Sequence, residues 1–464
     1  MKKSFNYILK GMLLVTVLAF SSCEIEEIVD PNNPSVGSAI SNASFAEMQF
    51  LITGLESRHR GYFGNAAQMF GSFGREVWPY FASDPRFIGD WLDMGGDGTY
   101  SDFFGSGGTY ATPYLAVKQA NIVIQAAENS TKISAQQVSA AKGIAKTIKG
   151  YQLLWPLMQQ WNNGIRIEVE DPLNPGPRVG IDNPTEALQA IQGVLNEGLS
   201  DLQAAGGTLG FKLSVGFSGF DTPAGFAQVN RAIAARVALY AKDYAGALNA
   251  LNGSFIDLNV DATSTAKMQR GPAHVYGQPP DGENPLFQPF DRPTAAILIC
   301  HPAWIEDALP NDARLNKVRQ LVTNKITNSG LRNANGELLV GEYQDVRWSD
   351  NGADIPFIRN EELILIYAEA QLFSNNTTEA VRAINIVRNT WGVGNYDAAG
   401  KSQDDILEEI LFQRRYSLWN EGGHRWIDLR RTGKLDAAHV DLRDQGHLIL
   451  QVARPSTEIN WDGN

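Results

Sequence analysis

The sequence is poor in the residues that build redox and metal sites. Its 464 residues include only two cysteines and six histidines, and no two histidines form a His-Glu-x-x-His motif. Cys300 and His301 are adjacent, and neighbours on an extended chain cannot face one site. No motif marks a catalytic pair among the 51 acidic residues either. The sequence therefore predicts no catalytic residue, no metal site and no cofactor.

Basic charge and long apolar runs are also scarce. Lys and Arg number 39 against 51 Asp and Glu, which gives a net charge of −12. Proteins that bind nucleic acid carry basic faces, so this balance argues against a nucleic-acid partner. No segment reaches the ~18–20 consecutive apolar residues that span a bilayer, which excludes a polytopic membrane protein. An apolar fraction of 43% is ample for a folded core.

Two local patterns resemble ligand-binding loops without completing them. The glycine clusters Gly95–Gly98 and Gly105–Gly108 lack the strand–turn–helix context of a phosphate-binding loop. Asp257, Asn259 and Asp261 resemble the start of an EF-hand loop, but its sixth position lacks glycine and its twelfth is Met268. The sequence favours plain turns at these places, and it leaves open whether a structural calcium is bound.

The N-terminus has the pattern of an export signal. Three lysines precede the apolar run Gly11–Phe20, which is too short to span a membrane, and two serines then lead to Cys23. This ending resembles a lipoprotein signal, in which the cysteine becomes the acylated first residue. We therefore predict a signal peptide over residues 1–22 and lipidation of Cys23. The alternative is an ordinary cleaved signal followed by a chance cysteine.

An acidic stretch follows the predicted lipid site. Residues 23–37 contain four acidic side chains and two prolines, and they resemble the tether that directs some lipoproteins to the cell surface. A solvated linker is the simpler interpretation, and both can hold. Loss of residues 1–22 would change the net charge from −12 to −15. With Cys23 acylated no disulfide can form, so Cys300 is expected to be a buried small hydrophobe.

Apolar residues at helical spacing dominate the rest of the chain and predict an all-α fold. The predicted helical stretches are Pro113–Ala127, Ala135–Trp161, Pro184–Gln203, Gln228–Leu251, Leu363–Phe373, Thr378–Trp391 and Asp404–Trp419. Asn230–Ala245 and Thr378–Asn389 resemble degenerate tetratricopeptide-like helix pairs. Long irregular loops are expected over Phe63–Thr112, Glu170–Pro184 and Asp257–Arg314.

Three C-terminal segments resemble one family. Pro356–Gln371, Ile406–Leu435 and Pro455–Asn460 resemble the signature of the SusD/RagB family of outer-membrane nutrient-binding lipoproteins, and Pro113–Ile124 resembles an N-terminal helix of that family. Within the signature, Asp404 is expected to cap its helix, and an ion network is expected to join Arg425, Asp428 and Arg430.

The resemblance implies a non-enzymatic lipoprotein on the outer-membrane surface. Such proteins act as the lid of a SusC-like TonB-dependent transporter and capture oligosaccharides, or sometimes peptides. It also implies an N-terminal helical region over 38–255 that is intertwined with a C-terminal RagB/SusD region over 256–464. The alternatives are a lid for peptide or another nutrient without sugar affinity and, remotely, a glycoside hydrolase.

Aromatic residues in the irregular segments suggest a sugar site. Sugar rings stack on aromatic planes, while their hydroxyl groups need carboxylate, amide or guanidinium partners. The candidate ligand-binding residues are Trp78, Tyr80, Phe81, Asp84, Arg86, Trp91, Asp93, Tyr276 and Trp304. The opposing interpretation is that Trp78–Phe81 seals the core or faces the transporter. The sequence does not identify the sugar, its linkages or its length.

Overall fold

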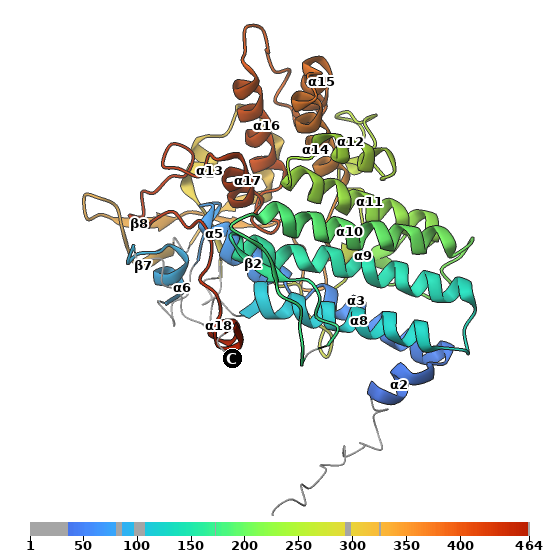
Figure 1. Ribbon diagram of the computed structural model, residues 1–464. Helices are drawn as coiled ribbons and strands as arrows, with labels where there is room; N and C mark the ends of the chain where they lie inside the picture. Colours follow the sequence, from blue (N-terminus) through green and yellow to red (C-terminus); the bar gives the residue numbers. More distant parts are fainter. Residues whose placement is uncertain are drawn as a thin grey trace, which may run out of the picture.

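The fold is described from a computed structural model covering residues 36–79, 86–96, 107–171, 173–292, 298–323 and 326–462 (Figure 1). The predicted signal peptide, the predicted lipid site Cys23 and the candidate residues Tyr80, Phe81 and Asp84 lie outside these ranges.

Helices make up most of the molecule, as the sequence predicts (Figure 1). The α-helices are α2 Val36–Asn42, α3 Phe45–His59, α4 Phe63–Asn65, α5 Gly71–Phe73, α6 Arg86–Trp91, α8 Thr112–Asn129, α9 Ala135–Gln160, α10 Pro184–Ala204, α11 Pro223–Tyr240, α12 Tyr244–Asn252, α13 Pro302–Glu306, α14 Asn360–Phe373, α15 Thr377–Thr390, α16 Gln403–Ser417, α17 His424–Thr432 and α18 Ser456–Asp462. Tighter or wider helical turns are η1 Ala66–Phe70, η2 Gly107–Ala111, η3 Val215–Phe217, η4 Thr265–Lys267 and η5 Ala313–Lys317.

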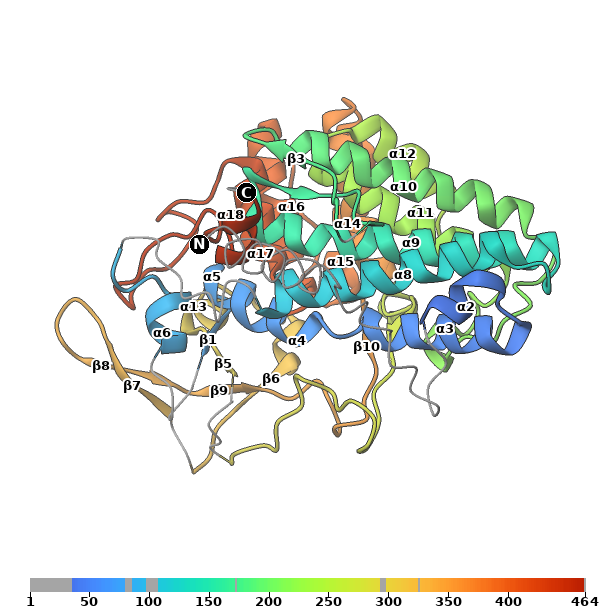
Figure 2. The same cartoon turned by 60° about the horizontal axis from the view of Figure 1, so that its bottom comes forward.

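The long helices pack against their sequence neighbours in a layered body (Figures 1 and 2). Helix α8 packs on α9, α9 on α10, and α10 on α11. Two glycines of α9 allow its close approach to α10. A β-carbon on Gly143 would lie 2.6 Å from Cγ of Leu202, and one on Gly150 would lie 2.7 Å from Leu195. Side chains at these positions would therefore force the two helices apart.

The two predicted helix pairs are present. Helices α11 and α12 form one hairpin, and α14 and α15 form the other. The stretch predicted as one helical unit over Gln228–Leu251 is divided at Lys242, whose φ is 58°. Asp243 then caps α12 by accepting a hydrogen bond from the amide of Gly246 at 2.9 Å.

Helical structure also occurs where the sequence analysis expects none. Helix α3 was not predicted, although Ser44 and Glu47 form a complete capping box at its start. Phe63–Phe73 was expected to be irregular, but it is helical through α4, η1 and α5. Its frequent glycines lower helix propensity, and burial of its aromatic side chains compensates for that loss. Helix α16 begins after Ser402, which replaces Asp404 as the cap.

Short strands join distant parts of the chain and were not predicted. They are β1 Val77–Pro79, β2 Asn163–Arg166, β3 Arg178–Ile181, β4 Ala273–His274, β5 Leu298–Cys300, β6 Val318–Gln320, β7 Ile326–Arg332, β8 Leu338–Gly341, β9 Tyr343–Asp345 and β10 Ile355–Pro356. One sheet has the order β1-β5-β9-β6, with Val77 opposite Cys300. All of these strands except β7 have two to four residues, a length too short to show an alternating pattern.

The C-terminal signature contains a buried ion network whose membership differs from the prediction. Asp428 accepts hydrogen bonds from Arg414 at 2.6 Å and from Arg431 at 2.8 Å. Arg431 also pairs with Glu369 at 2.5 Å. Burial alone would raise the pKa of Asp428, but the two guanidinium groups lower it to about 2. The network therefore fixes α17 against α14 and α16.

The other two arginines predicted for this network bind carbonyl oxygens instead. Arg425 donates to the carbonyl of His439 at 2.9 Å. Arg430 donates to the carbonyls of Leu450 and Met158 at 2.8 Å each, and its guanidinium lies 4.1 Å from the ring centre of Trp426. The predicted ion network of Asp428 with these two arginines was therefore wrong. Both arginines donate to backbone carbonyl groups of other segments and so attach α17 to those segments.

Candidate functional site

Three of the predicted sugar-stacking tryptophans lie inside the protein. Trp78 is 1% exposed, Trp91 is 2% exposed and Trp304 is fully buried. The indole nitrogen of Trp78 donates to Asp444 at 3.1 Å, and the Trp304 ring packs 5.0 Å from Trp419. A ligand has no open ring face to stack on, so these residues are corrected from binding residues to core residues.

These aromatics are buried because they seal the junction between the first and last parts of the chain. Arg75, just before β1, binds Asp444 at 2.8 Å, and both side chains are buried. Cys300 is buried beside Trp304, as the sequence predicts. A segment rich in aromatics and interrupted by glycine therefore serves the core here, which was the opposing interpretation.

Two polar candidates of this region, Asp93 and Arg86, lie within the described residues. Asp93 is buried after α6, and its carbonyl accepts a hydrogen bond from His447 at 2.7 Å. Arg86 is exposed at the first position of α6. Within the part of the chain that the structure describes, these two residues lie near tryptophans that are buried.

Tyr276 is a described aromatic candidate that lines a hollow beside α3. Although its side chain is 7% exposed, it borders a space of about 520 Å³ over the end of α3, here called the Tyr276 cleft. The guanidinium of Arg60 lies 5.5 Å from its ring centre. Burial raises the pKa of the Tyr276 hydroxyl above its usual value, so the phenol is neutral and retains its proton. The cleft is lined by Ser57, Arg60, Gly61, Gly64, Asn65, Gln68, Tyr276, Pro280, Asp281, Gly282, Glu283 and Pro285.

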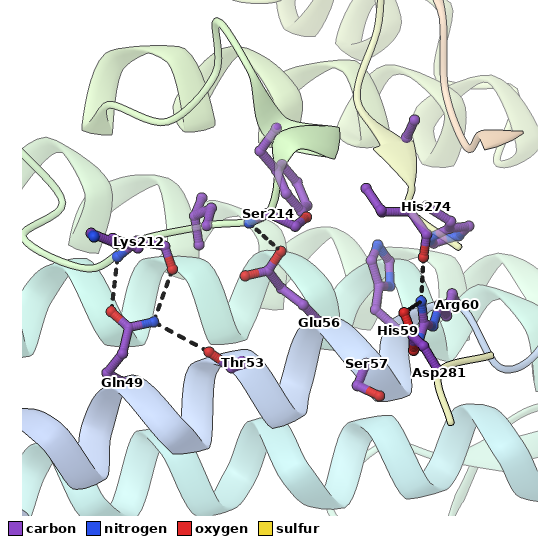
Figure 3. A pocket seen from close by; sticks show the side chains of 14 residues that line it. Gln49, Thr53, Glu56, Ser57, His59, Arg60, Lys212, Ser214, His274 and Asp281 are labelled. Carbon is purple, nitrogen blue, oxygen red and sulfur yellow. Dashed lines mark hydrogen bonds and ion pairs between the residues drawn. The ribbon is translucent and has the colours of Figure 1, made fainter. Parts of the chain in front are cut away.

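A second hollow adjoins the first along the same helix. It has a volume of about 580 Å³ and is here called the α3 cleft (Figure 3). The two clefts share Ser57, Arg60 and Asp281. Arg60 forms an ion pair with Asp281 and donates to the carbonyl of Val275, so this pair separates the two spaces. Its guanidinium holds the pKa of Asp281 below the usual value.

Polar side chains of α3 line the second cleft at helical spacing (Figure 3). Gln49 binds the backbone of Lys212 in both directions, donating at 2.9 Å and accepting at 2.9 Å. Glu56 accepts a hydrogen bond from the amide of Ser214 at 3.0 Å. Burial raises the pKa of Glu56, and the Ser214 bonds oppose that shift. These contacts hold the 212–214 segment over the helix.

The inner wall of the α3 cleft contains two buried histidines. His59 and His274 have ring centres 4.7 Å apart. Gln152 donates to Nδ1 of His59 at 2.7 Å. Burial lowers the pKa of His59 to about 3, and burial together with the neighbouring charge lowers that of His274 well below its usual value. Both rings are therefore neutral, and they offer an apolar edge rather than a charge.

The spacing of polar residues in α3 could have indicated this site from the sequence. Gln49, Thr53, Glu56 and Arg60 recur every three or four residues, while Met48, Ile52, Leu55 and His59 form the buried face of the same helix. Recognising the polar stripe requires that α3 be identified as a helix first. Its covering segments, residues 212–217 and 273–285, have no sequence link to it.

A third hollow lies where β1 meets β5 and β8. It measures about 460 Å³ and has Trp78 and Cys300 in its lining, with Glu306, Tyr343 and Arg443 among its polar groups. Arg443 is already paired with Glu306 and Asp441. Arg443 is therefore already bound to two carboxylates, and the Trp78 ring is buried. For these reasons this hollow is a poorer candidate for a ligand site than the two clefts on α3.

The chemistry of the two clefts suits binding rather than reaction. Amide, hydroxyl, carboxylate and guanidinium groups alternate along them beside a tyrosine edge. Within the described ranges, no three His, Cys, Asp or Glu side chains gather closely enough to hold a metal ion. Among the described helices, none is long and apolar enough to cross a membrane.

Comparison with known proteins agrees with the C-terminal motifs. The model of the SusD family matches residues 323–462, which contain all three C-terminal motif segments. No curated protein matches the sequence.

Solved structures share the fold over nearly the whole chain. A surface glycan-binding protein A from Bacteroides thetaiotaomicron, solved with laminarihexaose, has a TM-score of 0.65 at 16% identity, covering 90% of this chain and 98% of its own. A SusD superfamily protein of the same organism has a TM-score of 0.62 at 17% identity, covering 90% and 98%. NanU of B. fragilis has a TM-score of 0.56 at 16% identity, covering 92% and 95%. The C-terminal part of the chain thus matches the SusD family, and the chain shares a SusD-like fold over nearly its whole length.

Proposed function

We propose that this protein binds an oligosaccharide at the surface of the outer membrane, with the α3 cleft and the Tyr276 cleft as its binding site. The observation that carries the proposal is the pair of adjoining hollows that share Arg60 and Asp281 and have polar side chains of α3 in their lining. A ligand of several sugar units could occupy both hollows and contact the shared wall between them. The hydroxyl groups of the sugar would find hydrogen-bond donors and acceptors among the side chains of both clefts.

The likeness to the SusD family supports binding without catalysis. SusD-like proteins bind carbohydrate and are not catalysts, and they are associated with the cell surface and outer membrane. The protein solved with laminarihexaose has the same fold as this chain. These likenesses support a glycan ligand without specifying which one.

The anchor and the partner belong to the same proposal. We infer that residues 1–22 are removed, that Cys23 carries lipid, and that residues 23–37 form the tether. We further infer that the protein delivers its ligand to a SusC-like TonB-dependent transporter and acts as its lid. The division into residues 38–255 and 256–464 stays a prediction.

The test is calorimetric titration of the chain lacking residues 1–23 against plant, host and microbial oligosaccharides. We expect saturable heat with one glycan class. Arg60→Ala should weaken that binding at least tenfold, or by more than ~1.4 kcal/mol, because it removes a group shared by both clefts. Arg382→Ala is the matched control, since Arg382 is an exposed arginine of α15 that pairs with Glu379.

The outcomes separate the function from the site. Binding that survives Arg60→Ala unchanged would keep carbohydrate capture and refute the α3 site. Absence of heat across the whole panel would refute sugar binding. The alternative, a lid for peptide or another nutrient, would then be tested with peptides in the same assay.

A further inference from the structure

A larger hollow lies away from α3, between α8 and α18. Its volume is about 660 Å³, within the ~300–1,000 Å³ typical of small-molecule sites. One wall is a stripe of α8 that runs from Tyr114 to Glu128, and the opposite wall is α18 with Trp461. The hollow shares no lining residue with the α3 cleft or the Tyr276 cleft.

The walls of this hollow are largely apolar. Side chains from four separate segments contribute to them, namely Ile40, Tyr114, Ile122, Ile124, Val169, Pro175 and Trp461. Trp461 is 46% exposed, so part of its ring is open to a ligand. A sugar placed against aliphatic walls would lose water from its hydroxyl groups without gaining partners. The walls therefore favour a ligand with an apolar body.

Most charges at the mouth of the hollow are already paired. Glu128 pairs with Lys142 at 2.8 Å, Glu170 pairs with Lys149, and Glu458 pairs with Arg166 at 3.1 Å. Lys118 lies exposed on the α8 stripe, and no carboxylate of the described residues pairs with it. The mouth thus offers one uncompensated positive charge.

An unsatisfied amide lies in the same stripe. Both polar atoms of the Asn121 side chain are covered and lack a hydrogen-bond partner among the described residues. A buried polar group without a partner costs ~1–3 kcal/mol. An oxygen-bearing head group that reached Asn121 would remove this cost, one turn of helix from Lys118.

Helix α18 is held in place as a wall by arginines of other segments. Asp462 at its end pairs with Arg166, with Arg178 at 3.0 Å and with Arg454. Because these ion pairs use the acids of α18, they also remove negative charge that would repel an anionic ligand.

We propose that the α8–α18 hollow binds an amphipathic carboxylate, with its apolar body between Ile122 and Trp461 and its head group at Lys118. Two features point to this class: an apolar interior and a single unpaired cation at the mouth. The inference is independent of the sugar site.

The probe is sodium dodecanoate, titrated below its micellar concentration into the chain lacking residues 1–23 and followed by calorimetry. We expect one saturable site. Ile122→Asp should weaken binding at least tenfold, because it places a charge in the apolar wall. Lys118→Met should weaken it several-fold, and Lys401→Met, at an exposed lysine, is the matched control. Trp461→Ala should also weaken binding, because it removes part of the opposite apolar wall. Since Trp461 is half exposed, this change should leave the protein folded.

Four results would overturn the proposal. The first is no saturable binding of dodecanoate. The second is binding that neither Ile122→Asp nor Trp461→Ala weakens. The third is equal binding of dodecanol, which lacks the charge. Binding of phosphatidylglycerol vesicles in place of dodecanoate would indicate a membrane-facing surface instead and would also refute it. Sugar titrations of the same variants should match the unmodified chain, so failure here leaves the α3 site unaffected.

Discussion

The three buried tryptophans and Tyr276, which lies beside Arg60, differ in what surrounds them, although all four aromatic residues were predicted to bind ligand. Trp78, Trp91 and Trp304 are covered by protein. Tyr276 borders open space beside Arg60, which links the Tyr276 cleft to the α3 cleft. The comparison teaches that aromatic density along the sequence does not distinguish a ligand platform from a core. What distinguishes them is whether another segment of the chain covers the ring.

The strongest test of this difference is Trp78→Ala. Removal of a fully buried large aromatic typically costs ~3–5 kcal/mol, and here it also leaves Asp444 without one donor. We expect a loss of that size in urea unfolding and no selective loss of glycan affinity in molecules that remain folded. Trp461→Ala, half exposed, is the control and should cost less than ~1 kcal/mol. A stable Trp78→Ala protein with weaker sugar binding would reverse the comparison.

A second test uses Glu76, which lies next to the buried tryptophans. Its side-chain oxygens are buried without a hydrogen-bond partner among the described residues. Burial raises the pKa of Glu76 to about 8, although Arg415, Arg425 and Lys317 oppose the shift. The folded state therefore holds a proton that the unfolded state releases above its ordinary pKa of 4.5.

The raised pKa of Glu76 makes the free energy of unfolding fall as the pH rises. Because the folded state binds more protons than the unfolded state between pH 4.5 and about 8, Glu76 contributes a loss of stability across that window, on the order of a few kcal/mol. Glu76→Gln should flatten the dependence, as measured by urea unfolding at pH 5, 7 and 8.5. Glu379→Gln, in an exposed pair, is the control. An unchanged slope in Glu76→Gln would show that the carboxylate is ionised in the fold.

The smallest expected effect is that of Tyr276→Phe. The Tyr276 hydroxyl is buried without a partner among the described residues, so its loss should change the free energy of unfolding by less than ~1 kcal/mol. If the ligand bonds that hydroxyl, affinity should fall several-fold in calorimetry. Equal affinity would confine the role of Tyr276 to its ring, and Tyr396→Phe, in a remote loop, serves as the control.

The helical body could be predicted because its signal is local. The buried face of a helix such as α9 repeats over 26 residues, and periodicity of that length exceeds chance. The four-stranded sheet could not, since a strand such as β1, only three residues long, has its partner more than two hundred residues away. The partners of Asp428 could not be predicted for a similar reason. Several arginines lie close to it in sequence, and only the packing of the helices decides which of them it binds.

The candidate site was predicted only in part. Tyr276 was among the chosen residues, but Arg60, Glu56 and Asp281 were not. These groups have meaning only together, and they meet because segments near residues 60, 213 and 280 fold over one helix face. A sequence motif gives residue types and spacing, so it cannot show that these distant residues lie close together in the fold.

The contact between Arg75 and Asp444 has a consequence for how the chain is assembled. Strand β1 pairs with β5, and its Trp78 bonds a carboxylate, Asp444, that lies close to the C-terminus. Asp444 is residue 444 of 464, so nearly the whole polypeptide must exist before the core around Trp78 can be closed. Contacts this distant slow folding, because the loop must close before they stabilise anything. The core around Trp78 therefore closes late, whereas helices that pack on their sequence neighbours, such as α8 and α9, need only a nearby part of the chain.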